Sequence, residues 1–449
     1  MENLAHHHST APVPFTTRRG PVTMGLLWVT MVTVFPTVLV GFEWFKMGIT
    51  LPQVLLCSVL SCAVLLAYTI PTAQLSALTG KGYGLLNEQV FGSRATIGIN
   101  FLVLAVFTSF YGLCALFMAE GVNSMFNVKL PTAIMAAGFA VLMAFNNYFG
   151  FSGVANFARF VAAPALIVWV VCTFFRAASV CPHSVMSAAP QHPFSYCFGI
   201  ISTFVIGIAI WGNESDYWRH GKPRVGYSAI PLACALAIGE IIFPATGWMV
   251  ARVTSITDYS AATSFMSNYS FAGLPILGIL VLGASYFASN DSNLFGSSTA
   301  FEMTFKARHK YSVTVLTLLG AAMAYTLAAM GAEKALDAIA ALNCIILPTP
   351  SVIVLTNWTM TRQLGVYDYG QFSHTSAIIA LVAGIGVGIA TAGVIPALHA
   401  FQFGVPCLQA WATAALVFAV LRIKEYMCVP QFAVALAKER EPELTSSPR

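Results

Sequence analysis

Charged residues are scarce in this sequence. Only 9% of its 449 residues are Asp, Glu, Lys or Arg, whereas roughly a quarter of an ordinary soluble domain is charged. Hydrophobic residues make up 57% of the chain, and the mean hydropathy is +0.76. A chain with so little charge cannot cover itself with a polar surface, so we interpret it as an integral membrane protein.

Several catalytic signatures are also missing. The sequence has no Walker-type phosphate loop, no GxSxG nucleophile elbow and no HExxH metal motif. ATP is therefore excluded as the energy source, and we expect neither enzyme activity nor a bound cofactor. Because the loops leave no room for an energising domain, the sequence favours a gradient-driven carrier over a pump or a membrane enzyme.

The ten cysteines form no CxxC pair and fall mostly inside apolar runs. We interpret them as small packing residues. A disulfide between Cys181 and Cys197, near the outer face, is the less favoured alternative.

Twelve apolar runs are long enough to cross a hydrocarbon core of about 30 Å as helices. The sequence therefore predicts an all-α polytopic membrane protein. We expect spans at 22–43, 51–76, 96–122, 131–149, 153–175, 196–212, 228–250, 271–298, 312–331, 335–357, 374–396 and 404–422.

Lysine and arginine are distributed unevenly between the two sets of loops. Cytoplasmic loops carry the excess of Lys and Arg. One of the two sets of loops has only five basic residues, which are Lys46, Lys129, Arg176, Arg252 and Lys334. We expect both termini in the cytoplasm, an uncleaved first span and a location in the inner (cytoplasmic) membrane. The net charge of +5 then reflects contact with anionic lipid rather than nucleic-acid binding.

Helix breaks at membrane depth mark candidate sites, because an interrupted backbone must be buried in protein or line a water-filled cavity. In the first span, Pro36 removes a hydrogen bond to the carbonyl four residues earlier, and Thr30 and Thr33 precede it. The freed carbonyls could hold a cation. The alternative is a simple proline kink satisfied by the threonine hydroxyls.

The sixth span ends in "IWGNESDYWRHGKPR", where polar residues follow a lipid-compatible run. Gly212 and Asn213 predict a second break there. We expect Asp216, Arg219, His220 and Lys222 at the cytoplasmic mouth, where opposite charges can pair in partly wet surroundings. Asp216 would then be a gate or structural anchor. Glu214 lies between that gate and the substrate site.

The two breaks lie five spans apart, as in transporters built from two inverted five-helix repeats. We expect one transporter domain over 21–422, with a first repeat at about 22–175, a second at about 196–357 and two extra helices at about 374–422. Cytoplasmic tails at 1–20 and 423–449 would flank it.

The eighth span carries the polar stretch "SYFASNDSNLFGSS". At helical spacing Ser285 and Ser289 share one face, and Asn290 and Asn293 share another. Asp291 requires a partner or water at this depth. We expect the helix to continue through this stretch; the alternative is that it ends near residue 289.

Glu240 lies in the middle of the seventh span, and a carboxyl group inside a membrane is a functional candidate by default. It could take up and release a proton, or it could be a buried hydrogen-bonding residue without a transport role. In the third span, Phe110 and Tyr111 could stack on a planar ligand or pack in the core.

Four ordered stretches then carry a resemblance: "RRGPVTMG" at the first span, "SDYWRHGKPR" after the sixth, "FASNDSNLFGSSTAF" in the eighth and "ALNCIILPTPSVIVLTNW" in the tenth. They resemble the nucleobase:cation symporter family, which comprises cytosine and purine permeases and the allantoin and hydantoin transporters. The resemblance covers about 18–362.

The resemblance implies a five-plus-five inverted repeat of the LeuT type with two extra C-terminal helices. It also implies import of a planar, uncharged heterocycle with a cation by alternating access. The base would stack between aromatic residues of the third and sixth spans, with Phe110 at the first position. In our leading hypothesis, Asn290 or Asn293 orients it.

The sixth-span aromatic position falls on Gly207 if the stretch is aligned without a gap, and on Trp211 if it is shortened by four residues. The family's sodium site would fall on Thr30, Thr33, Ser285, Ala288 and Ser289. Ala288 stands where a hydroxyl residue is usual, and losing one oxygen weakens a hard-cation site. Proton coupling through Glu240 is therefore an alternative to sodium.

Our leading hypothesis is a monomeric secondary transporter whose partners are a small heterocycle, Na⁺ or H⁺ and membrane lipid. A second hypothesis keeps the fold but makes the substrate an amino acid or organic cation, because half-helix N-termini can hold a carboxylate. A third is a membrane enzyme or sensor that uses Glu214, Asp216 and Asp291.

Overall fold

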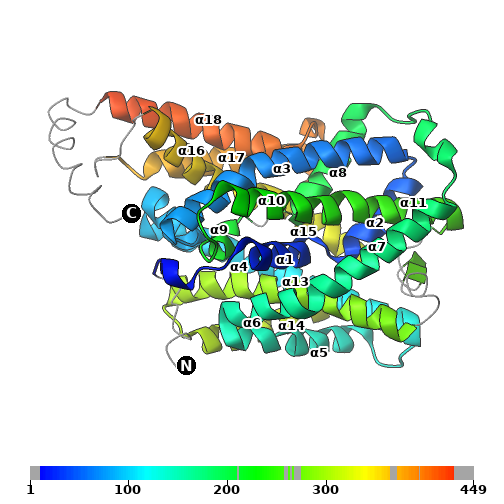
Figure 1. The fold of residues 1–449 in the computed structure, drawn as a ribbon. Coiled ribbons are helices and arrows are strands. Elements are labelled where there is room, and N and C mark those ends of the chain that lie inside the picture. The colour runs from blue at the N-terminus through cyan, green and yellow to red at the C-terminus, as the bar shows by residue number, and fades with distance from the viewer. Residues whose placement is uncertain are drawn as a thin grey trace.

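The computed structural model describes residues 11–209, 212–256, 261–262, 265–266, 275–364, 372–393 and 395–428. In these residues the secondary structure is helical, apart from one isolated bridge between Arg19 and Gly221. The long helices lie side by side in one bundle (Figure 1). The N-terminal segment around η2 (Phe15–Thr17) and the last turn of α18 (Pro406–Met427) lie at the same end of it.

The first half of the chain supplies the helices that correspond to the first five predicted spans. They are α1 (Pro21–Val32), α2 (Phe35–Lys46), α3 (Leu51–Thr79), α4 (Tyr83–Phe126), α5 (Thr132–Met143), α6 (Gly150–Phe157) and α7 (Ala163–Val180), with the short helices η3 (Phe145–Phe149) and η5 (His183–Ser187) and the π-helix η4 (Ala158–Ala162).

The second half continues the bundle and ends with a helix pair at its side. It comprises α8 (Phe194–Ala209), α9 (Glu214–Trp218), α10 (Val225–Leu236), the π-helix η6 (Ala237–Ile242), α11 (Phe243–Thr254), α13 (Pro275–Phe305), α14 (His309–Leu327), α15 (Ala332–Ile346), α16 (Pro348–Leu364), α17 (Thr375–Thr391), the short helix η7 (Pro396–Phe401) and α18.

Local sequence explains where α3 begins and ends. Its start is a capping box in which the Thr50 N–H donates to Gln53 Oε1 at 3.1 Å, so an otherwise unpaired donor is satisfied. Its end is Gly80, whose φ of +70° is the left-handed conformation that glycine adopts without steric cost.

The break in the first span differs from its prediction. Helices α1 and α2 meet at a bend of 45°, and the helical backbone is interrupted at Thr33 and Val34. Pro36 was predicted to be the site of the break, but it lies in the first turn of α2, where its missing N–H has no intrahelical partner to lose. The proline therefore starts the second half-helix.

The predicted break in the sixth span is present. Helix α8 ends at Ala209, α9 begins at Glu214, and Gly212 has a φ of +73°. Helix α13 runs from Pro275 to Phe305, so the alternative that the eighth span ends near residue 289 is wrong. The apolar residues that follow the Asn-Asp pair sustain the helix.

The structure also has a break that was not predicted. The tenth span is divided at Leu347, between α15 and α16. Gly212 packs directly on Leu347, since a Cβ on Gly212 would lie 2.3 Å from the Leu347 carbonyl oxygen. The breaks of the sixth and tenth spans therefore touch.

Two glycines permit the close crossing of α2 and α11. A Cβ on Gly41 would lie 2.1 Å from the Pro244 oxygen, and one on Gly247 would lie 1.9 Å from the Val38 oxygen. Small residues at helix contacts let backbones approach closely in membranes. The first span is thereby fixed against the seventh.

Among the described residues, seven helices have the length and apolarity required of a membrane span, and the bent pair α1–α2 adds an eighth. This count treats 132–180 as one helix, although the chain turns at Gly150 (φ +61°). The chain is a multi-pass membrane protein, as predicted; the number of twelve spans stays a prediction.

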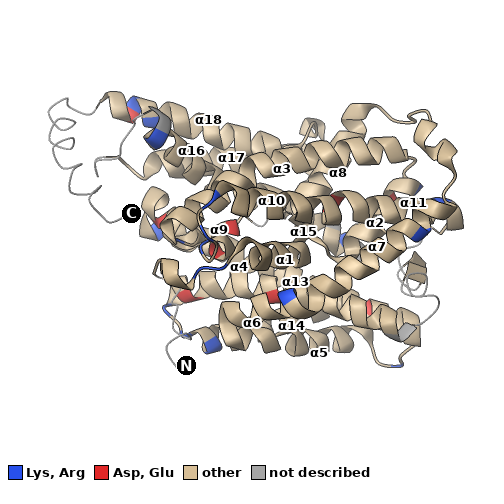
Figure 2. Cartoon of the chain, in the orientation of Figure 1, with Lys and Arg blue, Asp and Glu red and all other residues tan. Residues whose placement is uncertain are grey.

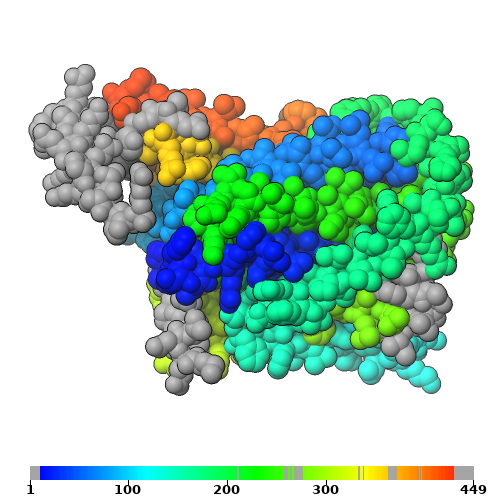
Figure 3. Space-filling model, viewed as in Figure 1, coloured from blue at the N-terminus to red at the C-terminus, as the bar shows by residue number. Residues whose placement is uncertain are grey.

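The basic residues are unevenly distributed along the bundle. Lys and Arg gather at the end of the bundle where η2 and the end of α18 lie (Figure 2). Contacts tie this end together, because the Arg18 guanidinium donates to the Val13 carbonyl and the Lys222 N–H donates to the Arg19 carbonyl. In Figure 3, α1 remains visible at the surface between α10 and α6.

Candidate functional site

A cavity lies where the first-span break meets α4, α8, α13 and α15. Its volume is ≈ 410 Å³ including its open side. None of its lining residues is charged. They are Met31, Val34, Pro36, Phe110, Leu113, Cys114, Phe117, Ile208, Ser289, Asn293, Leu336 and Asn343.

Phe110 and Phe117 bring aromatic rings to this cavity from α4. Phe117 is fixed by stacking on Tyr286, at 6.0 Å between ring centroids and 5° between ring planes. Tyr111 is not among the lining residues. Its hydroxyl donates to the Ala140 carbonyl, and its ring packs against Gly320 of α14, because the next residue of a helix points about 100° away.

Asn293 lines the cavity and carries an unsatisfied acceptor. Its amide nitrogen donates to Asn290 Oδ1 at 3.2 Å, while its Oδ1 is buried and has no hydrogen-bond partner among the described residues. Asn290 lies behind it, where its amide donates to the Tyr111 carbonyl at 3.0 Å. Asn290 therefore orients Asn293, and only Asn293 of this pair lines the cavity.

Gly207 does not line the cavity but packs against α15. A Cβ there would lie 2.5 Å from the Ala340 oxygen, and its carbonyl accepts a hydrogen bond of 2.7 Å from the Asn343 amide. Its neighbour Ile208 lines the cavity instead. Trp211, the other candidate for the sixth-span position, lies outside the described residues.

Asn343 of α15 is a cavity residue that our sequence reasoning missed. It lies in the quoted stretch "ALNCIILPTPSV", so an amide directly before a proline-rich break was the available signal. Asn213, by contrast, is buried beside α9 and donates to Asp216 Oδ2 at 3.3 Å. It contacts Asp216 and is not among the residues that line the cavity.

The five residues predicted to bind a cation are buried in α1, α13 and the break between α1 and α2. Ser285 Oγ accepts a hydrogen bond of 3.2 Å from the Phe35 N–H, which joins α13 to the start of α2. Thr33 Oγ1 has no partner among the described atoms, and the Thr30 hydroxyl donates to Leu27. Ser289 lies near Cys114, at 3.5 Å. Ala288 supplies no side-chain oxygen.

Glu214 accepts hydrogen bonds at the break of the sixth span. Its Oε1 accepts from the Gly212 N–H at 3.1 Å, and its Oε2 accepts from the Tyr68 hydroxyl at 3.2 Å. The Gly212 carbonyl accepts from Ser351 Oγ of α16 at 2.6 Å. Polar groups exposed by the interrupted backbone are thus satisfied by side chains, as burial in a membrane requires.

Asp216 was predicted to be a gate or structural anchor among opposite charges in partly wet surroundings, but its surroundings are buried rather than wet. Its side chain is buried, with 5% of the residue exposed. Its Oδ1 accepts from the Tyr83 N–H at 2.9 Å, and its Oδ2 accepts from Thr299 Oγ1 at 3.0 Å. Arg219 donates instead to the Asp216 backbone carbonyl. The carboxylate therefore satisfies the start of α4 and ties α9 to α13.

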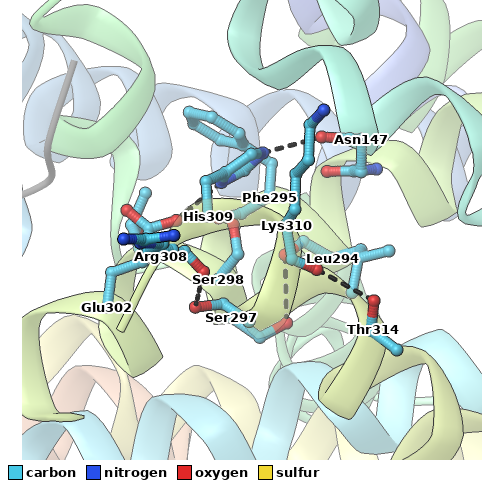
Figure 4. Close-up of polar contacts among 12 residues, drawn as sticks. Asn147, Leu294, Phe295, Ser297, Ser298, Glu302, Arg308, His309, Lys310 and Thr314 are labelled. Atoms are coloured by element: carbon cyan, nitrogen blue, oxygen red, sulfur yellow. Dashed lines mark hydrogen bonds and ion pairs between the residues drawn. The ribbon is translucent and has the colours of Figure 1, made fainter. Parts of the chain in front are cut away.

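Asp291 is held by two amides of η3. Asn146 donates to its Oδ2 at 2.7 Å, and Asn147 donates to its Oδ1 at 3.2 Å. The Asn147 carbonyl contacts His309 Nε2 at 2.7 Å, and His309 Nδ1 lies 2.6 Å from Glu302 Oε1 (Figure 4). Asp291 therefore begins a polar chain toward the positively charged end of the bundle.

The ring of His309 lies at that end. Burial by itself lowers the pKa of His309, but the hydrogen bond and negative charge of Glu302 outweigh burial, and its pKa is raised. The two side chains are 25% and 9% exposed, so this ion pair is only partly screened by water.

Glu240 differs from the other buried carboxyl groups. It is completely buried in η6, and neither of its carboxyl oxygens has a hydrogen-bond partner among the described residues. Its neighbour Gly239 packs on the carbonyl of Val32, the last residue of α1. Glu240 thus lies beside the first-span break but does not line the cavity.

The cysteines follow the favoured prediction. All ten are free thiols, including Cys181 and Cys197. Within the described part of the chain, no cluster of three or more His, Cys, Asp or Glu could hold a metal ion.

Comparisons with known proteins define the class of this fold. No protein-family model matches the sequence, and no curated protein matches it. Among solved structures, a sodium-coupled sialic acid symporter in a substrate-bound outward-open state has a TM-score of 0.59 and 12% identity, over 91% of this chain and 90% of that one. The chain therefore has the fold of a multi-pass secondary transporter.

A more similar structure is MHP1, a nucleobase-cation-symport-1 family transporter, in a closed conformation with bromovinylhydantoin bound. Its TM-score is 0.70 at 16% identity, over 93% of this chain and 94% of that one. The inward-facing conformation of the same transporter has a TM-score of 0.66 at 18% identity, over 93% of each chain. The resemblance inferred from the four stretches is confirmed at the level of the fold.

Proposed function

We propose that this protein is a secondary transporter that imports an uncharged planar heterocycle, of the nucleobase, hydantoin or purine kind, together with Na⁺ or H⁺ by alternating access. One observation carries the proposal. At the meeting point of the broken first span and the aromatic α4, the cavity is lined by two phenylalanines and by an asparagine whose amide oxygen has no partner among the described residues, and none of its lining residues is charged.

This lining matches the chemistry of a flat, neutral ring. Phe110 and Phe117 offer π-faces, and aromatic rings stack favourably on planar ligands. Asn293 Oδ1 can accept one ring N–H, and Ser289 can donate or accept beside it. A zwitterionic amino acid or an organic cation would need a counter-charge, which the described lining does not supply.

We further propose the finer organisation inferred from the sequence. The twelve spans would form two inverted five-helix repeats with α17 and α18 as extra helices, in one domain over about 21–422. The positively charged end of the bundle would face the cytoplasm of a cell whose inner membrane holds the protein as a monomer. Thr30, Thr33, Ser285, Ala288 and Ser289 would form the candidate sodium site.

The deciding experiment is uptake by the purified protein in proteoliposomes. Radiolabelled cytosine, uracil, adenine, hydantoin and allantoin are tested with and without a sodium gradient and a pH gradient. We expect gradient-driven accumulation of at least one of them. Accumulation of amino acids but of none of these rings would overturn the proposed substrate class.

A matched pair of variants tests the site itself. Phe110→Ala removes a cavity ring and should weaken apparent substrate affinity roughly tenfold, because loss of stacking and burial costs about 1–2 kcal/mol. Phe101→Ala alters a 51% exposed ring of the same helix and should leave uptake unchanged. Equal effects of both variants would show that the cavity is not the binding site.

A further inference from the structure

Glu240 lies at a point where the helix itself is irregular. Its segment, η6, is a π-helix between α10 and α11, and single π-turns inside α-helices occur frequently at functional sites. The residue before it, Gly239, has no room for a side chain, because a Cβ there would lie 2.6 Å from the Val32 carbonyl oxygen. The carboxyl group is thus placed by backbone contact with the end of α1.

The surroundings of Glu240 favour its neutral form. The side chain is completely buried, and both oxygens lack a hydrogen-bond partner among the described residues. A carboxylate without a partner is far more costly to bury than a protonated carboxyl group. The arrangement seen here is therefore that of a carboxyl group that carries its proton.

No cation faces Glu240 from the elements packed against η6, namely α1, α3, α7, α10 and α11. The thiol of Cys62 in α3 interacts with it electrostatically, and α1 contains no titratable residue. The other titratable side chains of these helices are engaged elsewhere or lie at helix ends and exposed faces. They are Cys57, Tyr68, Cys172, Arg176, Tyr227, Cys234 and Arg252.

We propose that Glu240 is the binding site of the coupling proton. When open to the outside, its carboxylate takes one proton from hydronium and leaves water; when open to the inside, the carboxyl group returns that proton to water. Because Gly239 contacts Val32 at the first-span break, loss of the proton changes the packing next to the cavity. This inference rests on the proposed transport function and selects H⁺ for its coupling.

The candidate sodium site is consistent with this choice. Ala288 offers no side-chain oxygen, and the Ser285 hydroxyl accepts the Phe35 N–H. Of the side chains expected to bind a sodium ion, one therefore lacks an oxygen and another already accepts a hydrogen bond. A proton needs only one carboxyl oxygen, which Glu240 supplies.

The test measures proton and substrate movement together. Purified protein is reconstituted in vesicles that contain a pH-sensitive dye, with the membrane potential clamped, and the heterocycle found in the uptake experiment is added outside. Wild-type protein should acidify the lumen as substrate enters. Glu240→Gln mimics the protonated side chain, and should lower substrate-driven proton flux at least tenfold while substrate counterflow stays within about twofold.

Two variants control for structure. Glu43→Gln makes the same change on the surface of α2, where Glu43 pairs with Lys46, and should behave as wild type. Glu240→Asp keeps a carboxyl group and should retain part of the proton flux. If Glu240→Gln fails to fold, the wild-type measurement decides, because substrate uptake without proton movement overturns the proposal.

The outcomes separate this inference from the function on which it rests. Wild-type proton flux in Glu240→Gln, or heterocycle uptake driven by sodium alone, overturns the proton site and leaves the transport function intact. Proton-coupled uptake of a different substrate class, lost in Glu240→Gln, supports the proton site and overturns the heterocycle.

Discussion

Buried carboxyl groups at the positively charged end of the bundle and at its centre differ in their hydrogen bonds. At the positively charged end, Asp216 accepts hydrogen bonds from Tyr83 and Thr299. In the centre, Glu240 is equally buried and neither of its oxygens has a partner among the described residues. A satisfied carboxylate fixes helices together, whereas one without partners can change its protonation without breaking a bond. We propose that this difference separates Asp216, which anchors the fold, from Glu240, the proposed proton site.

The largest expected effect concerns Asp216, whose carboxylate has hydrogen-bond partners. Asp216→Ala leaves the Tyr83 N–H and the Thr299 hydroxyl without their acceptor, so the free energy of unfolding should fall by about 3 kcal/mol. Glu240→Met removes only groups without partners and should leave that free energy unchanged or slightly higher. Chemical unfolding in detergent measures both, with Glu88→Ala, at a partly exposed position of α4, as the control. Equal destabilisation by the two changes would abolish the distinction.

The next largest effect concerns Asn293, whose Oδ1 has no hydrogen-bond partner among the described residues. Asn293→Leu removes the Oδ1 acceptor and should weaken substrate affinity by roughly tenfold, the value of about one hydrogen bond. Stability should change little. Asn123→Leu, on α4 away from the cavity lining, is the control. Titration of purified protein with the transported heterocycle measures affinity. Unaltered binding by the Asn293 variant would show that this residue does not contact the substrate.

A smaller effect tests whether the cation site is incomplete. Ala288→Ser adds the missing hydroxyl oxygen, and hard cations bind more tightly as oxygen ligands are added. We expect stimulation of uptake by Na⁺ to rise roughly fivefold, or about 1 kcal/mol. Ala300→Ser makes the same change further along α13 and should have no effect. A variant as insensitive to Na⁺ as the wild type would show that this position is not near a cation.

The smallest effect concerns the pH dependence of stability at the positively charged end of the bundle. The pKa of His309 is raised in the folded protein by Glu302, so the pair stabilises the fold fully below the ordinary histidine value of 6.5 and loses this contribution as pH rises through the raised value. The loss should be about 1 kcal/mol or less. Unfolding of wild type and Glu302→Gln between pH 6 and 9 measures it. A parallel pH dependence in the two proteins would contradict the assignment.

Much of the site was accessible from the sequence, but its geometry was not. The polar run of the eighth span and the aromatic residues of the third predicted Asn293 and Phe110, and both line the cavity. Tyr111 follows Phe110 in the same motif, yet its ring turns toward α14. Adjacent residues on a helix face different neighbours, and only the packing decides which neighbour is the cavity.

Positions set by contacts between distant segments could not be predicted. The break at Leu347 carries no glycine of its own and is stabilised by Gly212 packing on it and by the Tyr83 hydroxyl, which donates to the Leu347 carbonyl at 3.1 Å. Asn343, one turn before that point, lines the cavity. Similarly, the partner of the Asp216 carboxylate is the Tyr83 N–H at the start of α4, far away along the chain.

By itself, the sequence determined that the protein is apolar enough to cross a membrane many times and that two of its spans, the first and the sixth, are interrupted. Composition and backbone chemistry suffice for these conclusions, because they act within a single segment. The tertiary structure decided which polar groups are satisfied. Glu214, Asp216 and Glu240 are all carboxyl groups in apolar surroundings, and only the helices packed around each one determine whether it anchors the fold or is left able to carry a proton.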